Sequence, residues 1–335
     1  MSRPSVLFIG GTGVISHASV ELAARRGYEV TVLNRGESAL RPAPQGVEVL
    51  HADVRDILSV GEALGRREFD VVAEFMAFTP EHVQRDIDFF AGRTGQYVFI
   101  SSASTYQKPP ARLPITESTP LRNPFSQYAR DKIASERVLN DAYRDSAFPV
   151  TIVRPSHTYD RTALPIVGGW TTIDRMLRGE PVVIHGDGTS LWVLTHSRDF
   201  ATGFVGLLGL PTAVGDTVQI TSDEVLSWNT ITDIMADAAG VEPSIVHVTS
   251  DRLASLDHAL SESLLGDRSH SVIFDNAKLK RLVPEFSATT TWAQGAREIM
   301  DWRRENPEQN VVDPELNGFF DRLVAEATQA RPQST

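Results

Sequence analysis

The chain has 335 residues, a formal net charge of −11 at pH 7 and no cysteine. The lack of cysteine excludes disulfides and thiolate chemistry, and the acidic balance argues against nucleic acid as a partner, because phosphates would be repelled. Apolar residues make up 41% of the chain, yet no apolar run approaches the ~18–20 residues that cross a bilayer. A first strand that begins by Val6 leaves no room for a leader peptide, so we expect a cytoplasmic protein without a membrane partner.

The first predicted strand, residues 6–9, runs into a glycine-rich turn, and a helical pattern follows at once. Gly10 would let the chain turn sharply, and Gly13 would let the backbone approach a pyrophosphate closely. The first turn of the helix would direct its N–H groups and its positive dipole end at that anion. A tight strand-to-helix turn without a ligand would show the same pattern, but we interpret this one as a dinucleotide site.

Strands and helices then alternate as far as residue 154. Predicted strands cover residues 29–33, 47–50, 69–75, 96–100 and 150–153, and predicted helices cover 14–27, 57–67, 80–91 and 125–144. Asn123-Pro124 would cap the last of these helices. The alternation predicts an α/β fold: a Rossmann-type doubly wound parallel sheet with a smaller, mainly C-terminal substrate-binding lobe.

The pattern becomes more irregular after Arg154-Pro155. Helices are predicted at 171–177, 199–208 and 228–239, and strands at 182–184, 217–220 and 272–274. We expect residues 1–154 to form the NAD(P)-binding domain, with 187–221 returning to it. Residues 155–330 would form mainly the substrate lobe, and 331–335 a frayed tail.

Tyr128 and Lys132 stand four residues apart, on one face of the predicted helix 125–144. A nearby ammonium favours phenolate, so we expect it to lower the pKa of the tyrosine. Ser101 and Ser102 end the strand before this helix and would direct hydroxyls into the same crevice. A solvated helix face and serines that cap backbone groups are the alternative readings.

In this order, the glycine turn, the serines and the Tyr-Lys pair resemble the extended branch of the short-chain dehydrogenase/reductase superfamily, the NAD(P)-dependent epimerase/dehydratase family. Further similarities are Asp53-Val54, Ala77, Val153-Arg154-Pro155, His196-Ser197-Arg198-Asp199 and Phe274-Asp275-Asn276-Ala277-Lys278-Leu279. The resemblance implies that Tyr128 is the catalytic acid/base, that Lys132 tunes it and binds the nicotinamide ribose, and that Ser102 binds the reacting oxygen.

The resemblance also implies two sets of binding residues. The cofactor set is Gly10, Thr12, Gly13, Val14, Ile15, Asn34, Arg35, Asp53, Val54, Ala77, Ser101, Tyr128, Lys132 and Pro155. The substrate set is Ser102, Ser104, His157 and Trp192. No histidine pair flanked by carboxylates occurs on one helix, so we predict no metal site.

Three departures from the family pattern concern the cofactor. The third glycine of the family is Ser16 here, which would hold the helix less closely to the strand. The acidic residue that ends the second strand is Asn34, and Arg35 follows it. Asparagine and arginine would accept a 2′-phosphate that a carboxylate repels, so we favour NADP over NAD, although Arg35 could be an ordinary exposed cation.

Other departures concern the substrate. The Asp-Glu pair of the nucleotide-sugar 4,6-dehydratases is replaced by Ser104-Thr105, which argues against dehydration. The segment 190–193 lacks the arginine that grips a sugar diphosphate in relatives, so the substrate stays open. Trp192 could stack on a ring or pack in the core, and His157 could contact substrate or be a satisfied loop histidine. Glu74 could face the crevice or solvent.

The expected function is therefore that of an NAD(P)-dependent epimerase or reductase. It would act on a hydroxyl or keto carbon of a sugar, a nucleotide sugar or a polyol-like substrate. The alternative is a binding or regulatory protein of the same fold, redox-sensing or RNA-associated. The resemblance also implies a homodimer through helices 80–91 and 125–144, although the apolar stripe of Val83, Ile87 and Phe90 could equally pack within one monomer.

Overall fold

The computed structural model describes residues 3–37, 40–255 and 258–329. The tail predicted at 331–335 lies outside the described residues. Within the part described, no helix is both long enough and apolar enough to cross a membrane.

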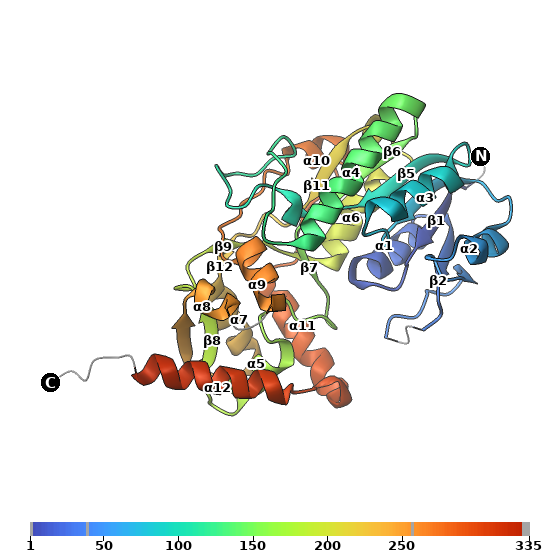
Figure 1. Cartoon of the computed structure of the whole chain (residues 1–335). Coiled ribbons are helices and arrows are strands. Elements are labelled where there is room, and N and C mark those ends of the chain that lie inside the picture. Colours follow the sequence, from blue (N-terminus) through green and yellow to red (C-terminus); the bar gives the residue numbers. More distant parts are fainter. Residues whose placement is uncertain (1–2, 38–39, 256–257, 330–335) are drawn as a thin grey trace.

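A seven-stranded parallel sheet forms the N-terminal part of the molecule (Figure 1). Its strands are β1 (Ser5–Ile9), β2 (Glu29–Asn34), β3 (Glu48–His51), β4 (Phe69–Glu74), β5 (Thr94–Ile100), β6 (Val150–Pro155) and β11 (Thr217–Ile220). Their order across the sheet is β11-β6-β5-β4-β1-β2-β3, which confirms the doubly wound α/β fold. The order reverses between β1 and β4, and ligands of such sheets bind at the carboxyl ends of the strands beside this point.

Helices cover both faces of the sheet because its strands bury side chains on both sides. Val6 and Phe8 of β1 belong to a core cluster on one face, and Leu7 and Ile9 belong to a cluster on the other. The first face carries α1 (Val14–Arg25), α6 (Ser197–Leu207) and α10 (Ala277–Leu282). The second carries α2 (Ile57–Leu64), α3 (Pro80–Phe90) and α4 (Gln127–Ser146).

The smaller C-terminal region is mixed. Three short strand pairs join β7 (His157–Tyr159) to β10 (Leu194–His196), β8 (Val182–His185) to β13 (Ile245–Val248), and β9 (Leu191–Trp192) to β12 (Leu226–Ser227). Its helices are α5 (Gly169–Leu177), α7 (Trp228–Ala239), α8 (Ser250–Ala254), α9 (His258–Ser263), the π-helix η3 (Leu264–Arg268), α11 (Trp292–Glu305) and α12 (Pro314–Gln329). Short 3₁₀ turns are η1 (Ala103–Thr105), η2 (Pro211–Ala213) and η4 (Pro307–Gln309).

Several predicted elements differ from those observed, among them one strand and two helices. Residues 272–274 form no strand, and Phe274 makes only an isolated bridge with Ile115. Helix α4 begins at Gln127 with Ser126 as its cap, and Asn123 holds only the turn before it: its Oδ1 accepts from the Phe125 N–H (3.2 Å), while its Nδ2 donates to the carbonyls of Ser104 (2.9 Å) and Gly266 (2.7 Å). Helix α2 ends at Leu64 rather than at residue 67, and Gly65 follows it with a φ of 56°.

Candidate active site

The glycine turn after β1 needs glycine at its first two positions. Gly10 has a φ of +87°, and a Cβ there would lie 2.4 Å from the Cγ of Met76. A Cβ at Gly11 would lie 2.9 Å from the methyls of Val32 on β2. The chain can therefore turn tightly at this end of the sheet and start α1 close against it.

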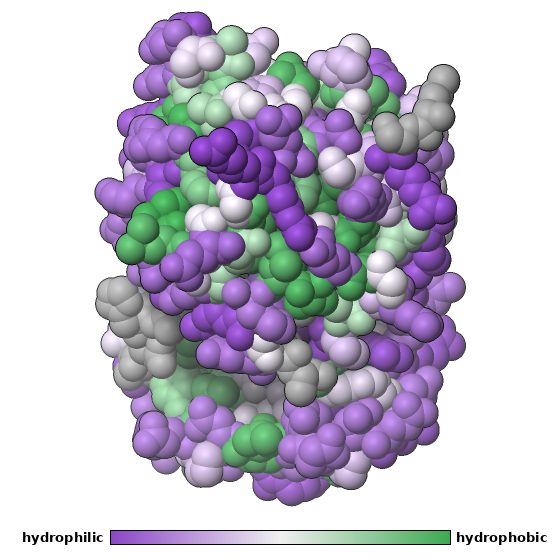
Figure 2. Space-filling model, turned by 90° about the vertical axis from the view of Figure 1, so that its right-hand side faces the viewer, coloured by the Kyte–Doolittle hydropathy of each residue, from purple (hydrophilic) through white to green (hydrophobic). Residues whose placement is uncertain are grey.

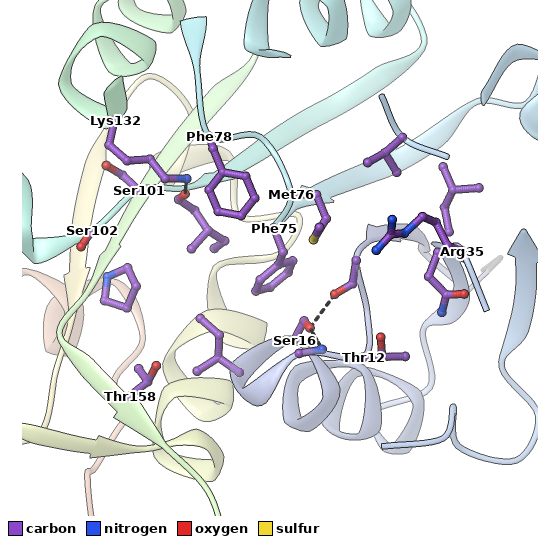
Figure 3. A pocket seen from close by; sticks show the side chains of 18 of the residues that line it. Thr12, Ser16, Arg35, Phe75, Met76, Phe78, Ser101, Ser102, Lys132 and Thr158 are labelled. Atoms are coloured by element: carbon purple, nitrogen blue, oxygen red, sulfur yellow. Dashed lines mark hydrogen bonds between the residues drawn. The ribbon is translucent and has the colours of Figure 1, made fainter. Parts of the chain in front are cut away.

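Ser16 closes this turn instead of merely filling the place of a glycine. Its hydroxyl accepts a hydrogen bond from the Gly13 N–H (2.9 Å) and donates one to the Gly10 carbonyl (2.6 Å) (Figure 3). The N–H groups of the helical residues after Gly13 have no intrahelical partner. The turn is thus preshaped, and α1 still presents donors for an anion.

A cavity of about 470 Å³ extends from this turn to the end of β5. In Figure 3, Thr12, Ser16 and Arg35 lie on one side of it and Ser101 and Lys132 on the other. Eleven residues of the cofactor prediction line it: Gly10, Thr12, Gly13, Ile15, Asn34, Arg35, Val54, Ser101, Tyr128, Lys132 and Pro155. Val14, Asp53 and Ala77 of that prediction are not among its lining residues. A tight glycine turn, a helix N-terminus and an elongated cavity fit a dinucleotide.

Glu37 lies beside Arg35 at this cavity and is a carboxylate that our cofactor prediction did not include. Arg35 forms an ion pair with Glu37 (Nη2 to Oε2, 3.1 Å), and both side chains are exposed. Asn34 accepts a hydrogen bond from the Gly36 N–H (2.8 Å). Arg35 therefore lies at the cavity, where a neighbouring carboxylate competes for its guanidinium, and the preference for NADP stays a prediction.

Lys132 is buried beneath the cavity, with 1% of its surface exposed. Its ammonium donates to the carbonyls of Ala77 and Ile100, both at 2.7 Å. Burial lowers the pKa of Lys132 to about 8, against the attraction of Glu74 and Glu136. The ammonium is thus fixed at the carboxyl ends of β4 and β5.

Tyr128 lines the cavity one helical turn before Lys132, but its pKa is raised, not lowered as we predicted. Desolvation is the largest cause, and Asp267 adds to it, whereas a hydrogen bond with Ser102 opposes both. The Lys132 ammonium lies 5.8 Å from the centre of the Tyr128 ring and donates to carbonyls instead. The phenol is therefore protonated at neutral pH in this structure.

Glu74 faces neither the crevice nor solvent, the two orientations that the sequence left open. It is 2% exposed, and its Oε1 accepts hydrogen bonds from the N–H groups of Met76 and Ala77, the latter at 2.7 Å. Burial raises its pKa well above the usual range, and the adjacent Asp86 adds to this. Glu74 therefore holds the turn whose Ala77 carbonyl binds Lys132.

A second cavity, of about 180 Å³, adjoins the first and shares Ser102, Pro155 and Ser156 with it. All four residues of the substrate prediction line it: Ser102, Ser104, His157 and Trp192. His157 is also satisfied internally, because its Nδ1 accepts from the Trp192 indole N–H (3.1 Å). Burial lowers the pKa of His157 to about 3, so the ring is neutral.

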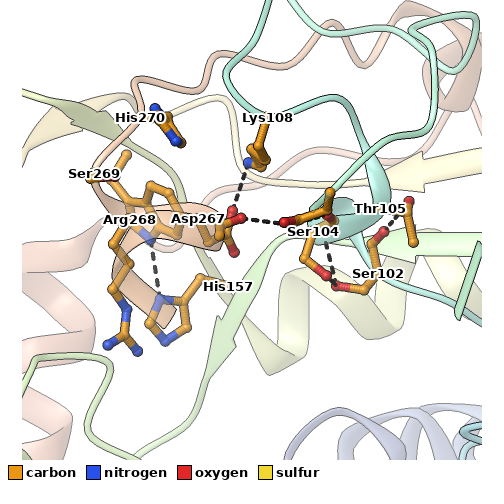
Figure 4. A network of polar contacts seen from close by, with 12 residues as sticks. Ser102, Ser104, Thr105, Lys108, His157, Asp267, Arg268, Ser269 and His270 are labelled. Carbon is orange, nitrogen blue, oxygen red and sulfur yellow. Dashed lines mark hydrogen bonds and ion pairs between the residues drawn. The ribbon is translucent and has the colours of Figure 1, made fainter. Parts of the chain in front are cut away.

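Sequence reasoning missed the charged residues of this second cavity. Asp267 and Arg268 line it, and the buried Lys108 donates to the Asp267 carboxylate at 2.6 Å (Figure 4). These residues come from the loop after β5 and from η3, so no local motif connects them. Phe274 also lines the cavity, from the segment that we had predicted as a strand.

The fold and the two adjoining cavities define a nucleotide-binding protein of the extended short-chain dehydrogenase/reductase type. The family model described as "NAD dependent epimerase/dehydratase family" matches residues 6–220. The chain belongs to this family.

Two curated proteins and one solved structure illustrate its similarities. It is 26% identical over 259 residues to the chloroplast stem-loop binding protein of 41 kDa b of Arabidopsis thaliana (73% of this chain, 66% of that protein). It is 27% identical over 291 residues to 2'-dehydrokanamycin reductase of Streptomyces kanamyceticus (84% of this chain, 79% of that protein). A dTDP-glucose 4,6-dehydratase from Bacillus anthracis in complex with NAD has a TM-score of 0.74 at 18% identity, over 91% of this chain and 98% of that one. The chain spans just under two thirds of the length of the first of these relatives.

Proposed function

We propose that the chain is an NAD(P)-dependent epimerase or reductase. It acts on a hydroxyl or keto carbon of a sugar, a nucleotide sugar or a polyol-like substrate. The observation that carries this proposal is the placement of Ser102, Tyr128 and Lys132 in one cavity with the glycine turn. The likeness to 2'-dehydrokanamycin reductase, over 84% of the chain, supports a carbohydrate substrate.

The roles of Ser102 and Tyr128 follow from their positions. When bound, the nicotinamide supplies or accepts hydride at its C4. Ser102 belongs to both cavities and donates a hydrogen bond to the reacting oxygen. Tyr128 gives a proton to that oxygen during reduction and removes it during oxidation. The raised pKa of Tyr128 keeps the phenol protonated, which suits reduction of a carbonyl.

Changing Tyr128→Phe tests this proposal. The variant loses the proton donor and keeps the ring, so turnover should fall by about 100-fold or more while NAD(P) affinity is retained. Turnover would be measured with a panel of sugars and nucleotide sugars, and cofactor affinity by fluorescence titration. Turnover without net change in nicotinamide absorbance identifies an epimerase, and net consumption of the reduced cofactor identifies a reductase. Unchanged turnover in the variant would refute the role of Tyr128.

A second candidate is the binding function, favoured by the 26% identity to a stem-loop binding protein. The net charge of −11 and the intact Ser102, Tyr128 and Lys132 favour catalysis instead. Binding of a stem-loop RNA together with no turnover on any sugar would support this alternative. We further propose NADP as the preferred cofactor, a homodimer as the assembly, and the cytoplasm as the location.

A further inference from the structure

Arg268 is a cation that lines the second cavity, which we call the substrate cavity. In the described chain, its guanidinium makes no hydrogen bond and no ion pair. Two more deeply buried arginines are paired with carboxylates: Arg154 with Glu136 (2.5 Å), and Arg175 with Asp321 (2.7 Å). Desolvation lowers the pKa of Arg268, and the neighbouring Asp267 opposes this shift only in part.

The other charges of this cavity compensate Arg268 only in part. Asp267 is its sequence neighbour, but the Asp267 carboxylate is bound by Lys108 at 2.6 Å. His157 is neutral. In Figure 4 the Arg268 side chain extends toward His157 and away from Lys108. Lys108, Asp267 and Arg268 together therefore carry one net positive charge, within a protein whose overall charge is −11.

The main chain of Arg268 is held in place by three side chains from different elements. Its carbonyl accepts hydrogen bonds from His185 Nε2 (3.0 Å), Ser190 Oγ (3.2 Å) and Trp228 Nε1 (3.2 Å). The guanidinium carbon also lies 5.9 Å from the centre of the Trp228 ring. A side chain supported in this way is preorganised for a ligand. The residue ends a π-helix, a form that is frequent at functional sites.

The size of the cavity limits what the guanidinium can receive. At about 180 Å³ it is much smaller than the first cavity of about 470 Å³, so it suits a single sugar ring. A nucleotide attached to that ring would extend outside the cavity.

We propose that Arg268 binds an anionic group of the substrate, a carboxylate or a phosphate, while the carbon to be oxidised or reduced lies beside Ser102. This inference rests on the proposed function in that it treats the bound anion as part of the substrate. Binding of the anion by Arg268 can be measured without any turnover. The guanidinium fork matches the two oxygens of either group. The anion can come from a uronic acid, a sugar phosphate or the diphosphate of a nucleotide sugar.

The test is calorimetric binding to the full chain saturated with NADP. The ligands are D-glucuronate, D-glucose 6-phosphate and UDP-glucose, with D-glucose as the neutral and D-glucosamine as the cationic comparison. At least one anion should bind more tightly than both comparisons, and Arg268→Gln should weaken it by about 10- to 100-fold. The anion whose binding depends on Arg268 shows whether the anionic group of the substrate is a carboxylate, a sugar phosphate or a nucleotide diphosphate. Arg161→Gln, an exposed arginine outside this cavity, is the matched control and should leave binding unchanged.

The inference is overturned if none of the three anions binds, if glucose or glucosamine binds as tightly as they do, or if Arg268→Gln has no effect. Should Arg268→Gln fail to fold, Arg268→Lys keeps the charge without the fork and should still weaken binding, by a smaller factor. Failure of the proposed function gives a different result. In that case no sugar would be turned over, or Tyr128→Phe would leave turnover unchanged, while the Arg268 dependence of anion binding would persist.

Discussion

Glu37 opposes the cofactor preference that Arg35 favours, because the two side chains pair at the rim of the cavity. An exposed pair of this kind contributes at most about 1 kcal/mol, so a 2′-phosphate can take Arg35 from Glu37. We expect Arg35→Ala to raise the NADP dissociation constant by about 10-fold or more, with little change for NAD. Glu37→Gln should lower the NADP dissociation constant by a few-fold.

Both constants would be measured by fluorescence titration for both cofactors. Arg66→Ala removes an exposed arginine elsewhere on the sheet domain and serves as the control. Wild-type protein that binds NAD more tightly than NADP would contradict this prediction.

Lys132 should give the reaction an alkaline limit. Its pKa is about 8, and loss of the proton removes the charge that holds the Ala77 and Ile100 carbonyls. We expect kcat/KM to fall above about pH 8. His157 titrates far below this range, with a pKa of about 3, and the pKa of Tyr128 is raised. A pH profile that stays flat up to pH 10 would exclude this role of Lys132.

Deprotonation of Lys132 should lower activity but raise the free energy of unfolding. The folded pKa of about 8 lies below the ordinary value of 10.5, so the folded chain binds fewer protons than the unfolded chain between these values. The contribution of Lys132 to the free energy of unfolding therefore rises with pH across this window. Lys132→Met should abolish that rise in urea unfolding experiments, and this check does not depend on activity.

The residues of the cofactor cavity were predictable where the signal is local. The glycine turn and the Tyr128–Lys132 spacing each lie within one or two elements, so sequence order alone places them. The pKa of Tyr128 was predicted in the wrong direction, because spacing cannot show that the Lys132 ammonium is held by two carbonyls. Arg268 was missed because its environment is assembled from His185, Ser190 and Trp228, which are far apart in the sequence.

Among the elements, the turn between β4 and α3 depends on Glu74. Glu74→Ala would leave the N–H groups of Met76 and Ala77 without an acceptor, at a cost of about 2–4 kcal/mol in the free energy of unfolding. Glu74→Gln keeps an acceptor oxygen at the same place and should cost less than about 1 kcal/mol. Urea unfolding measures both. Equal losses in the two variants would show that the cap does not stabilise this turn.

Helices and buried strands were predicted well because their apolar patterns extend over several residues. Helix α7 was predicted at its observed bounds, Trp228–Ala239, and strand β11 at Thr217–Ile220. The strand predicted at 272–274 was wrong because a short apolar run carries no information about a partner. These residues line the substrate cavity through Val272 and Phe274 instead of joining a ladder.

The assembly of the whole molecule is the least determined by the sequence. Val83, Ile87 and Phe90 lie in the core of the monomer, so their stripe gives no evidence of a dimer. A groove of about 750 Å³ does lie along α2, α3 and α4, lined in part by Ile57, Phe89 and Val138.

The face of the molecule seen in Figure 2 is mainly polar, with separate apolar patches.

If a second copy covers this groove, the protein should sediment at twice 36.8 kDa. Phe89→Glu would place a carboxylate in the groove and should give a monomer with cofactor binding retained, as measured by analytical ultracentrifugation. Val311→Glu adds the same charge at a site that is 71% exposed and should have no effect. A monomeric wild-type protein would contradict the homodimer.

The place of β11 at the edge of the sheet affects how the protein is synthesised. Strand β6 ends at Pro155, but its outer neighbour β11 begins only at Thr217, after the chain has passed through part of the other lobe. While the ribosome translates this interval, the backbone amides and carbonyls along the outer side of β6 have no partner strand, and an open edge of this kind invites pairing with other nascent chains. A product released near residue 154 would keep that edge exposed. The nucleotide-binding half is therefore complete only after β11 has been synthesised and has paired with β6.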